Sequence, residues 1–271
     1  MNPLCIDRID RIDTRLGPGL LLAVCLVFLY GCSTNSSGFE DVAPADELYA
    51  QGLESLKGRK ILGVYTWINY NRAREPFQAI IDNYPYSKYE TEAQIKIADT
   101  YFEEGNYEEA LSYYRGFADL HPQHPKVPYT ILRSALCYYN QIESIDRDQT
   151  STREALRYLE MLSTRYPYAP ATQEGEVILH QLRIQLADYM MEIGDFYLDR
   201  TQYQSAATRF RRVLDDYPGL GSDAEALYKL GLCYEEMKRI DEALRLYHVV
   251  VENFSSSPDA ERAAERIAGA E

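Results

Sequence analysis

The sequence has few cysteines, a single tryptophan and little positive charge. Its 271 residues include 5 Cys and 1 Trp, and 28 Lys and Arg stand against 42 Asp and Glu, which gives a formal net charge of −14. The only marked apolar run, Leu20 to Tyr30, has 11 residues, whereas a membrane-spanning helix needs about 20. These features exclude a disulfide-stabilised miniature protein and argue against nucleic acid as a partner, because an acidic surface repels phosphate backbones.

Signatures of catalysis and metal binding are missing as well. The sequence has no G-x-S-x-G motif and no Gly-rich loop followed by Lys and Ser or Thr. Its four histidines lack metal-ligand spacing; the stretch from His121 to Pro125 (HPQHP) could chelate a metal weakly, but we expect a solvated loop. Asp146-Arg147-Asp148 is interpreted as a charged, solvent-facing insertion. We expect no enzyme, no cofactor and no bound metal.

The N-terminus carries an export signal. The apolar run has the length of a signal-peptide core, and it ends in Leu29-Tyr30-Gly31-Cys32, which is similar to the bacterial lipobox, where the Cys is acylated and becomes the first residue. An ordinary signal peptide is the alternative. We predict a lipoprotein signal peptide over residues 1–31, lipidation of Cys32, and a flexible tether over residues 32–45, which contains Ser, Asn, Gly and Pro. Ser33 after the Cys fits delivery to the outer membrane.

Two cysteines, Cys137 and Cys233, belong to the body of the protein. A disulfide between them is conceivable in an oxidising periplasm. The repeat pattern described next gives them equivalent helix positions, however, so we expect two buried thiols.

The body of the chain is repetitive. Aromatic or histidine residues followed by proline close successive apolar-periodic segments, at Tyr84-Pro85, His121-Pro122, Tyr166-Pro167 and Tyr217-Pro218, with intervals of 37, 45 and 51 residues between the prolines. A period in the thirties indicates a helical solenoid of the tetratricopeptide (TPR) type. We predict an all-α fold of about five helix pairs and a C-terminal helix over residues 46–271, with N-terminal repeats in 46–125, a middle repeat in 126–170 and C-terminal repeats in 171–271.

Small and aromatic residues recur in the TPR register. In the second unit, Ala98 and Ala110 allow two helices to approach closely, while Tyr101, Tyr107 and Tyr114 fill the space between neighbouring pairs. The first and third units carry insertions, and the 51-residue interval predicts an unusually long helix from about residue 171 to 199. Ser-x-x-Glu patterns suggest capping boxes at Ser87, Ser151 and Ser222, and Ser257 precedes Pro258 at the start of a last helix.

These features together resemble the BamD/ComL family, the TPR lipoproteins of the outer-membrane β-barrel assembly machine. The resemblance rests on the lipobox and tether, the opening Asp46 to Ala50 (DELYA), the turn Asn83 to Ser87 (NYPYS), the HPQHP loop, Asp146-Arg147-Asp148 and the long helix. It covers essentially the whole mature chain.

The resemblance implies two kinds of partner for a protein anchored by lipid to the periplasmic face of the outer membrane. C-terminal repeats of the family bind the periplasmic repeat domains of the barrel-forming subunit. Arg209 stands where the family has a pairing Arg, with Arg211 and Arg212 beside it. N-terminal repeats bind nascent outer-membrane β-barrel proteins, and Tyr84 and Tyr89 match tyrosines near the proposed substrate groove.

Three further aromatic residues, Tyr65, Trp67 and Tyr70, lie in the first-unit insertion. They are either packing residues or an exposed aromatic surface that extends the groove. Two other functions remain open: a periplasmic TPR tether in envelope constriction or peptidoglycan synthesis, or a secretin pilot lipoprotein. The insertions and the long helix favour barrel assembly.

Overall fold

The computed structural model describes residues 42–61, 65–144 and 147–270. The predicted signal peptide, Cys32 and nearly all of the predicted tether lie outside these residues, as does Asp146. The body, Pro44–Glu271, forms a unit separate from Met1–Ala43. Its described helices are α2 (Ala45–Leu56), α3 (Tyr70–Asn83), α4 (Glu90–Glu104), α5 (Tyr107–Leu120), α6 (Val127–Tyr139), α7 (Thr150–Arg165), α8 (Pro170–Asp199), α9 (Tyr203–Asp216), α10 (Asp223–Glu236), α11 (Ile240–Asn253) and α12 (Pro258–Ala270).

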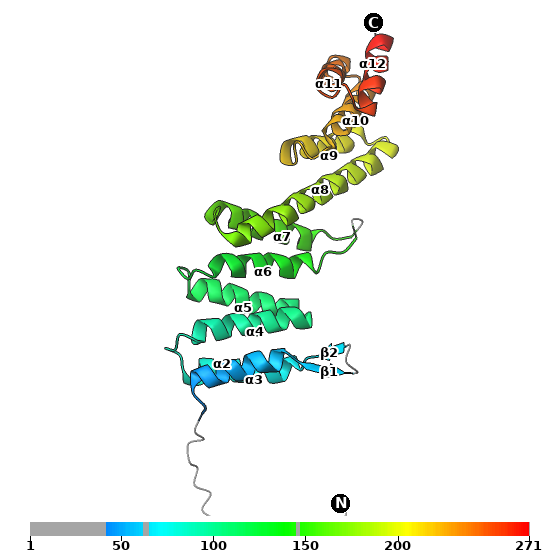
Figure 1. Cartoon of the computed structure of the whole chain (residues 1–271). Coiled ribbons are helices and arrows are strands. Elements are labelled where there is room, and N and C mark those ends of the chain that lie inside the picture. Colours follow the sequence, from blue (N-terminus) through cyan, green and yellow to red (C-terminus); the bar gives the residue numbers. More distant parts are fainter. Residues whose placement is uncertain (1–41, 62–64, 145–146, 271) are drawn as a thin grey trace, which may run out of the picture. The chain divides into compact units, whose positions relative to one another are not determined.

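The helices form five sequential pairs, from α2–α3 to α10–α11, and α12 packs on the last pair (Figure 1). Each helix packs mainly against its neighbours in the chain, as expected for a solenoid. The predicted all-α TPR fold is therefore confirmed. The long helix predicted near residues 171–199 is also confirmed, because α8 runs for 30 residues.

A short hairpin was not predicted. Strands β1 (Arg59–Ile61) and β2 (Tyr65–Trp67) pair antiparallel inside the first-unit insertion, with Arg59 opposite Trp67 and Lys60 opposite Thr66. Three-residue strands give almost no periodicity in a sequence, so the pattern that revealed the helices could not reveal them.

The helix ends repeat as closely as the helices do. A single type of ending closes the second helix of every pair: the residue after the helix has φ between −126° and −135°, and its N–H donates to the carbonyl four residues earlier. The residues in this position are Tyr84, His121, Tyr166, Tyr217 and Phe254. The aromatic-proline punctuation therefore marks real helix ends, where the following proline prevents continuation.

The capping boxes were predicted less well. The Ser257 hydroxyl accepts from the Ala260 N–H at 3.2 Å, as expected for a cap. Ser222 is the N-cap of α10 but makes no side-chain capping bond, and Ser151 lies inside α7, which begins one residue earlier. Ser87 precedes the N-cap of α4 by two residues and bonds the Tyr89 N–H instead.

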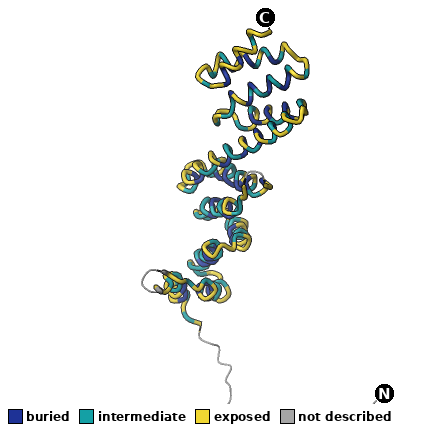
Figure 2. Tube along the Cα trace, turned by 90° about the vertical axis from the view of Figure 1, so that its right-hand side faces the viewer, coloured by how far each residue is buried: buried dark blue, intermediate teal, exposed yellow. Residues whose placement is uncertain are grey.

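In the first, fourth and fifth pairs, a glycine on the first helix faces an aromatic ring on the second. A Cβ added at Gly52, Gly194 or Gly231 would lie 2.4–2.5 Å from the ring of Phe77, Phe210 or Tyr247, respectively. The buried residues of the body concentrate on these inward faces (Figure 2). Cys137 and Cys233 are both free and fully buried, so the expectation of two buried thiols is confirmed.

This close approach gives a stability prediction for Gly231→Ala. The Tyr247 ring cannot easily move away, because it is 1% exposed and its hydroxyl donates to Glu235 at 2.8 Å. We expect overpacking to lower the free energy of unfolding by about 1–3 kcal/mol, measured as a lower midpoint of urea unfolding.

Gly116→Ala is the matched control. Gly116 also lies inside a helix, but a Cβ there would meet nothing within 4 Å. Its replacement should leave stability unchanged or raise it by about 0.5–1 kcal/mol, because alanine restricts the unfolded chain. Equal losses in both variants would contradict the packing argument.

Candidate functional site

Helix α9 carries the three arginines predicted to bind a partner, and the structure separates their roles. The Arg211 guanidinium donates to the Tyr234 hydroxyl on α10, and the Arg212 Nε lies 3.3 Å from Asp216 Oδ2 one turn away. Arg209 is half-buried, and its side chain makes no hydrogen bond or ion pair with any residue that the structure describes. Of the three charges, the charge of Arg209 is the one left for an external carboxylate.

The two predicted groove tyrosines flank the turn between α3 and α4. Tyr84 follows the last residue of α3, and Tyr89 is the N-cap of α4. The Tyr89 ring lies 5.2 Å from the ring of Tyr49 on α2, which in turn meets Phe77 edge-on at 5.6 Å. Tyr89 therefore helps to join the first three helices, and Tyr49 is a member of this cluster that the sequence did not single out.

The insertion aromatics lie at the other end of α3. Trp67 ends β2 and is 55% exposed, while Tyr70 begins α3 and is half-buried. Tyr65 begins β2. The 14 residues of α3 separate this group from Tyr84, a distance of about 21 Å along the helix. The five predicted groove residues therefore fall into two groups along the chain, one near each end of α3.

A further groove lies between α3 and α5. It has a volume of ≈ 280 Å³. Its lining residues are Gln78, Ile81, Gln94, Ser112, Tyr113, Gly116, Phe117 and Leu120. Tyr113 is 36% and Leu120 70% exposed, so apolar surface faces solvent here. The sequence did not reveal this groove. The repeat pattern identifies which helix positions are buried in the core, but it does not show which apolar residues of each second helix face outward.

Two other exposed tyrosines were also missed. Tyr86 and Tyr168 are 101% and 95% exposed, and both are the second tyrosine of a Tyr-Pro-Tyr turn. A large aromatic placed just after a helix end has no core to enter. That position is the sequence signal that could have identified them.

The HPQHP loop is more buried than we expected. The rings of His121 and His124 both lie against Phe117, at 5.0 and 5.1 Å between centroids, and both residues are half-buried. The loop therefore packs on the core rather than being fully solvated. Among the described residues, no group of His, Cys, Asp and Glu could hold a metal ion.

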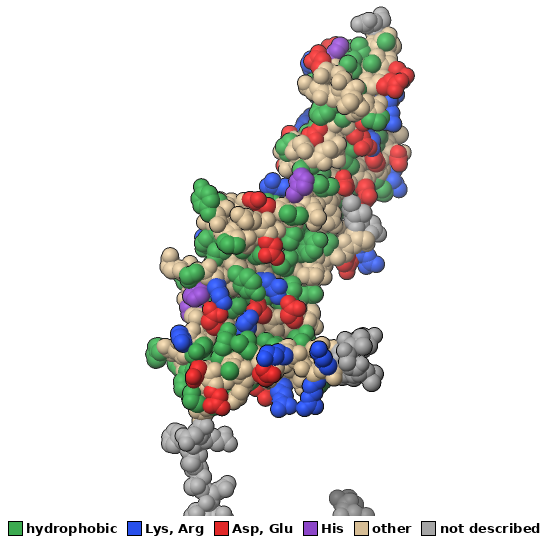
Figure 3. All heavy atoms as spheres, viewed as in Figure 1, with side chains coloured by type: hydrophobic (Ala, Val, Ile, Leu, Met, Phe, Trp, Pro, Cys, Tyr) green, Lys and Arg blue, Asp and Glu red, His purple; other side chains and the backbone are tan. Residues whose placement is uncertain are grey.

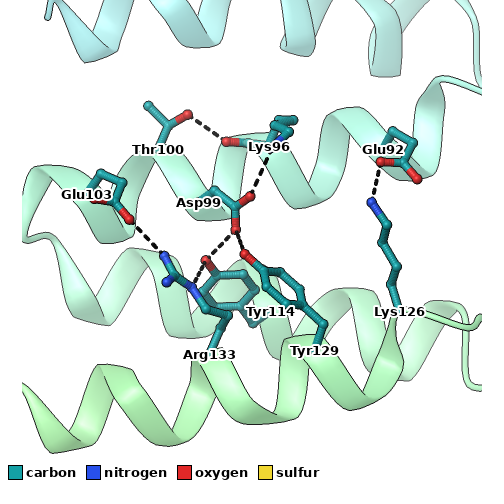
Figure 4. Close-up of polar contacts among 9 residues, drawn as sticks. All are labelled: Glu92, Lys96, Asp99, Thr100, Glu103, Tyr114, Lys126, Tyr129 and Arg133. Carbon is teal, nitrogen blue, oxygen red and sulfur yellow. Dashed lines mark hydrogen bonds and ion pairs between the residues drawn. The ribbon is translucent and has the colours of Figure 1, made fainter. Parts of the chain in front are cut away.

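A polar network joins α4, α5 and α6 (Figure 4). Asp99 Oδ1 accepts hydrogen bonds from the hydroxyls of Tyr114, at 2.8 Å, and Tyr129, at 2.7 Å. The Arg133 Nε donates to the Tyr114 hydroxyl at 3.1 Å, and its guanidinium also reaches Glu103. Three helices from two repeats therefore share one carboxylate.

Burial raises the pKa values of both tyrosines, and the Asp99 charge raises them further. Both hydroxyls therefore stay protonated and remain donors at any physiological pH. The network has the properties of a structural clamp, since both tyrosine hydroxyls already have an acceptor.

The family of outer membrane lipoproteins called YfiO matches residues 42–249. The chain belongs to this family. The match covers every helix pair from α2 to nearly the end of α11. The sequence resembles the BamD/ComL family, and the curated relatives of this chain confirm that resemblance, because they carry the name BamD.

The outer membrane protein assembly factor BamD of Rickettsia prowazekii is 30% identical over 237 residues, which cover 88% of this chain and 90% of the relative. The protein of the same name from Neisseria gonorrhoeae is 25% identical, with coverage of 88% and 92%. A solved structure of the yeast Sti1 TPR2AB domain in complex with pHSP90 aligns with 83% of this chain and 82% of its own length at 16% identity and a TM-score of 0.40. Among the described residues of the YfiO-family chain, no helix has the length and apolarity to cross a membrane.

Proposed function

We propose that this YfiO-family chain is a lipid-anchored subunit of the machinery that assembles β-barrel proteins in the outer membrane. It acts as a scaffold, without catalysis: acyl chains on Cys32 hold it at the periplasmic face, its C-terminal repeats bind the barrel-forming subunit, and its N-terminal repeats bind nascent barrel proteins. Curated relatives that match most of the chain are named outer membrane protein assembly factors, which supports this proposal.

The observation that carries the partner assignment is the unpaired Arg209. A half-buried guanidinium without an internal acceptor loses part of its hydration and gains nothing in return within the described chain. A carboxylate from the barrel-forming subunit would supply a directional, bidentate partner. Arg211 and Arg212 are already bonded to Tyr234 and Asp216, so they shape the surface around Arg209 and contribute less binding free energy.

The apolar groove between α3 and α5 is the part of the N-terminal repeats that best fits an extended substrate strand. The exposed side chains of Tyr113 and Leu120 supply hydrophobic contact. The amide nitrogens of Gln78 and Gln94 already donate to Asp82 and Glu90, and their amide oxygens can accept from a peptide backbone. Tyr84 and Tyr89 lie at the end of α3 and the start of α4. Weak contacts at several such points would hold a strand and still release it.

Arg209→Glu tests the proposal. We expect at least about a tenfold loss of affinity for the periplasmic domains of the barrel-forming subunit, because the substitution replaces an attractive charge pair with a repulsive one. The measurement is the dissociation constant with the purified subunit, together with co-purification from the native envelope. The far-ultraviolet circular dichroism should not change.

Arg212→Glu is the matched control, with the same charge change three residues further along α9. Its side chain is paired internally, so its effect on binding should be much smaller. Equal affinities for the parent and Arg209→Glu proteins would refute the residue assignment, and failure to recover any barrel protein from the envelope would refute the function.

A further inference from the structure

Positive charge in this acidic chain is concentrated in one short segment. Between Ser55 and Arg74 there are five Lys and Arg residues and no Asp or Glu, whereas the whole chain has a net charge of −14. The segment covers the end of α2, the β-hairpin and the start of α3. Figure 3 shows Lys and Arg side chains gathered on this part of the surface.

The hairpin places an exposed aromatic ring beside two of these charges. Arg59 and Trp67 are cross-strand partners, and directly opposed residues of an antiparallel pair point to the same face. Both side chains line a pocket of ≈ 330 Å³ that Arg72, at the start of α3, also lines. The remaining lining residues are Glu54, Ser55, Gly58 and Asn69. Trp67 is 55% exposed, so the indole faces solvent next to two guanidinium groups.

Most of this charge is not used within the described chain. Arg59, Lys60 and Arg72 are exposed, and none of their side-chain nitrogens forms an ion pair or hydrogen bond with a described residue. Lys57 pairs with Glu54, which leaves that pair neutral, and Arg74 is buried against Glu104 and does not face solvent. We call Arg59, Trp67 and Arg72 the basic hairpin surface, with a net charge of +2; Lys60, opposite Thr66, points to the other face of the hairpin.

We propose that the basic hairpin surface is a second membrane contact, which binds the anionic headgroups of the bilayer that holds the lipid anchor. This inference rests on the proposed lipidation of Cys32. A tryptophan beside two exposed Arg residues has the composition of a membrane-interface anchor, and a lipid chain combined with a basic patch binds membranes far more stably than either alone. The anionic bilayer repels the acidic remainder of the chain. The contact at the hairpin therefore orients the solenoid on the membrane.

The lengths involved permit this contact. The 12 residue-to-residue steps from Cys32 to Pro44 span at most about 40 Å, so an acylated Cys32 would keep the start of α2 within that distance of the bilayer. Helix α2, with 12 residues, separates the tether from the hairpin by about 18 Å. An acidic protein is the other partner class for this charge, but it would not need an exposed indole beside the arginines.

Trp67 is the only tryptophan of the chain, so its fluorescence reports on this surface alone. The acylated protein is reconstituted into vesicles of phosphatidylcholine, with or without about one-third phosphatidylglycerol. With anionic lipid, we expect a blue shift of the Trp67 emission and quenching by lipids brominated in the acyl chain. Both effects should be absent in pure phosphatidylcholine and should be reversed by salt.

Arg59→Gln combined with Arg72→Gln should weaken the headgroup contact about 25-fold, or about fivefold per charge, and should abolish the blue shift. Arg200→Gln combined with Lys238→Gln is the matched control, because it removes the same charge from exposed sites in the C-terminal repeats. It should leave the Trp67 signal unchanged.

The outcomes separate this inference from the proposed function. If the protein floats with the vesicles while Trp67 stays solvent-exposed on anionic lipid, the membrane contact is refuted although the anchor is real. If the emission shifts only on addition of an acidic protein partner, the surface serves that partner and the proposal is wrong. Protein that does not float refutes lipidation, on which the proposal depends.

Discussion

Raising the pH above 9 should destabilise the solenoid steeply, because two buried thiols then favour the unfolded state. Cys137 and Cys233 have no exposed surface, and burial raises the pKa of each thiol from 9.0 to about 12. Below pH 9 the thiols are protonated in both states and the full stability is present. Between pH 9 and 12 they ionise when the chain unfolds but stay protonated in the folded state, so stability is lost as the pH rises.

The free energy of unfolding should fall by about 1.4 kcal/mol per pH unit for each thiol, or by about 2.7 kcal/mol per pH unit for both. The free energy of unfolding, measured by urea titration under reducing conditions between pH 8 and about 11, should show this decline. Cys137→Ala combined with Cys233→Ala should flatten the curve between pH 9 and 10. Above pH 10 a decline should persist in that variant, because burial also raises the pKa values of Tyr114 and Tyr247. The same slope in both proteins below pH 10 would show that the thiols are not responsible.

The repeat architecture was predictable because its signals lie close together in the sequence. Tyr-Pro and His-Pro mark the end of each second helix, and small residues such as Gly194 and Gly231 stand opposite rings such as Phe210 and Tyr247. Each of these relations spans one helix pair or less. A spacing argument can therefore find them, and the 51-residue interval correctly predicted the length of α8.

The candidate sites were harder to predict, because their properties depend on residues in other helices. Arg209, Arg211 and Arg212 are nearly indistinguishable in sequence, and only the positions of Tyr234 on α10 and Asp216 on α9 show which charge is left unpaired. The hairpin was missed because its strands have three residues each. The groove beside Leu120 depends on how α3 and α5 both pack against α4. None of these relations produces a periodic pattern in the sequence.

Asp99 gives the largest single-residue effect that we expect on stability. Asp99→Ala removes the acceptor shared by Tyr114 and Tyr129, two hydroxyls that burial keeps protonated. Tyr114 is fully buried, so its hydroxyl cannot turn to water. Each unsatisfied hydroxyl costs about 1–3 kcal/mol, and Lys96 loses its ion-pair partner. We expect a loss of about 3–5 kcal/mol in the free energy of unfolding, measured by urea denaturation.

Two further variants separate the causes. Asp99→Asn retains an oxygen that can accept from both tyrosines, so its smaller loss reports only the missing charge beside Lys96. Asp119→Ala removes an exposed carboxylate from α5 and should change stability by no more than about 0.5 kcal/mol. A loss for Asp99→Ala no larger than that for Asp119→Ala would mean that the tyrosines find other partners. The network joins α4 and α5 of the second helix pair to α6 of the third. A large loss would instead mean that these two repeats unfold together, and that the groove between α3 and α5 depends on Asp99 for its shape.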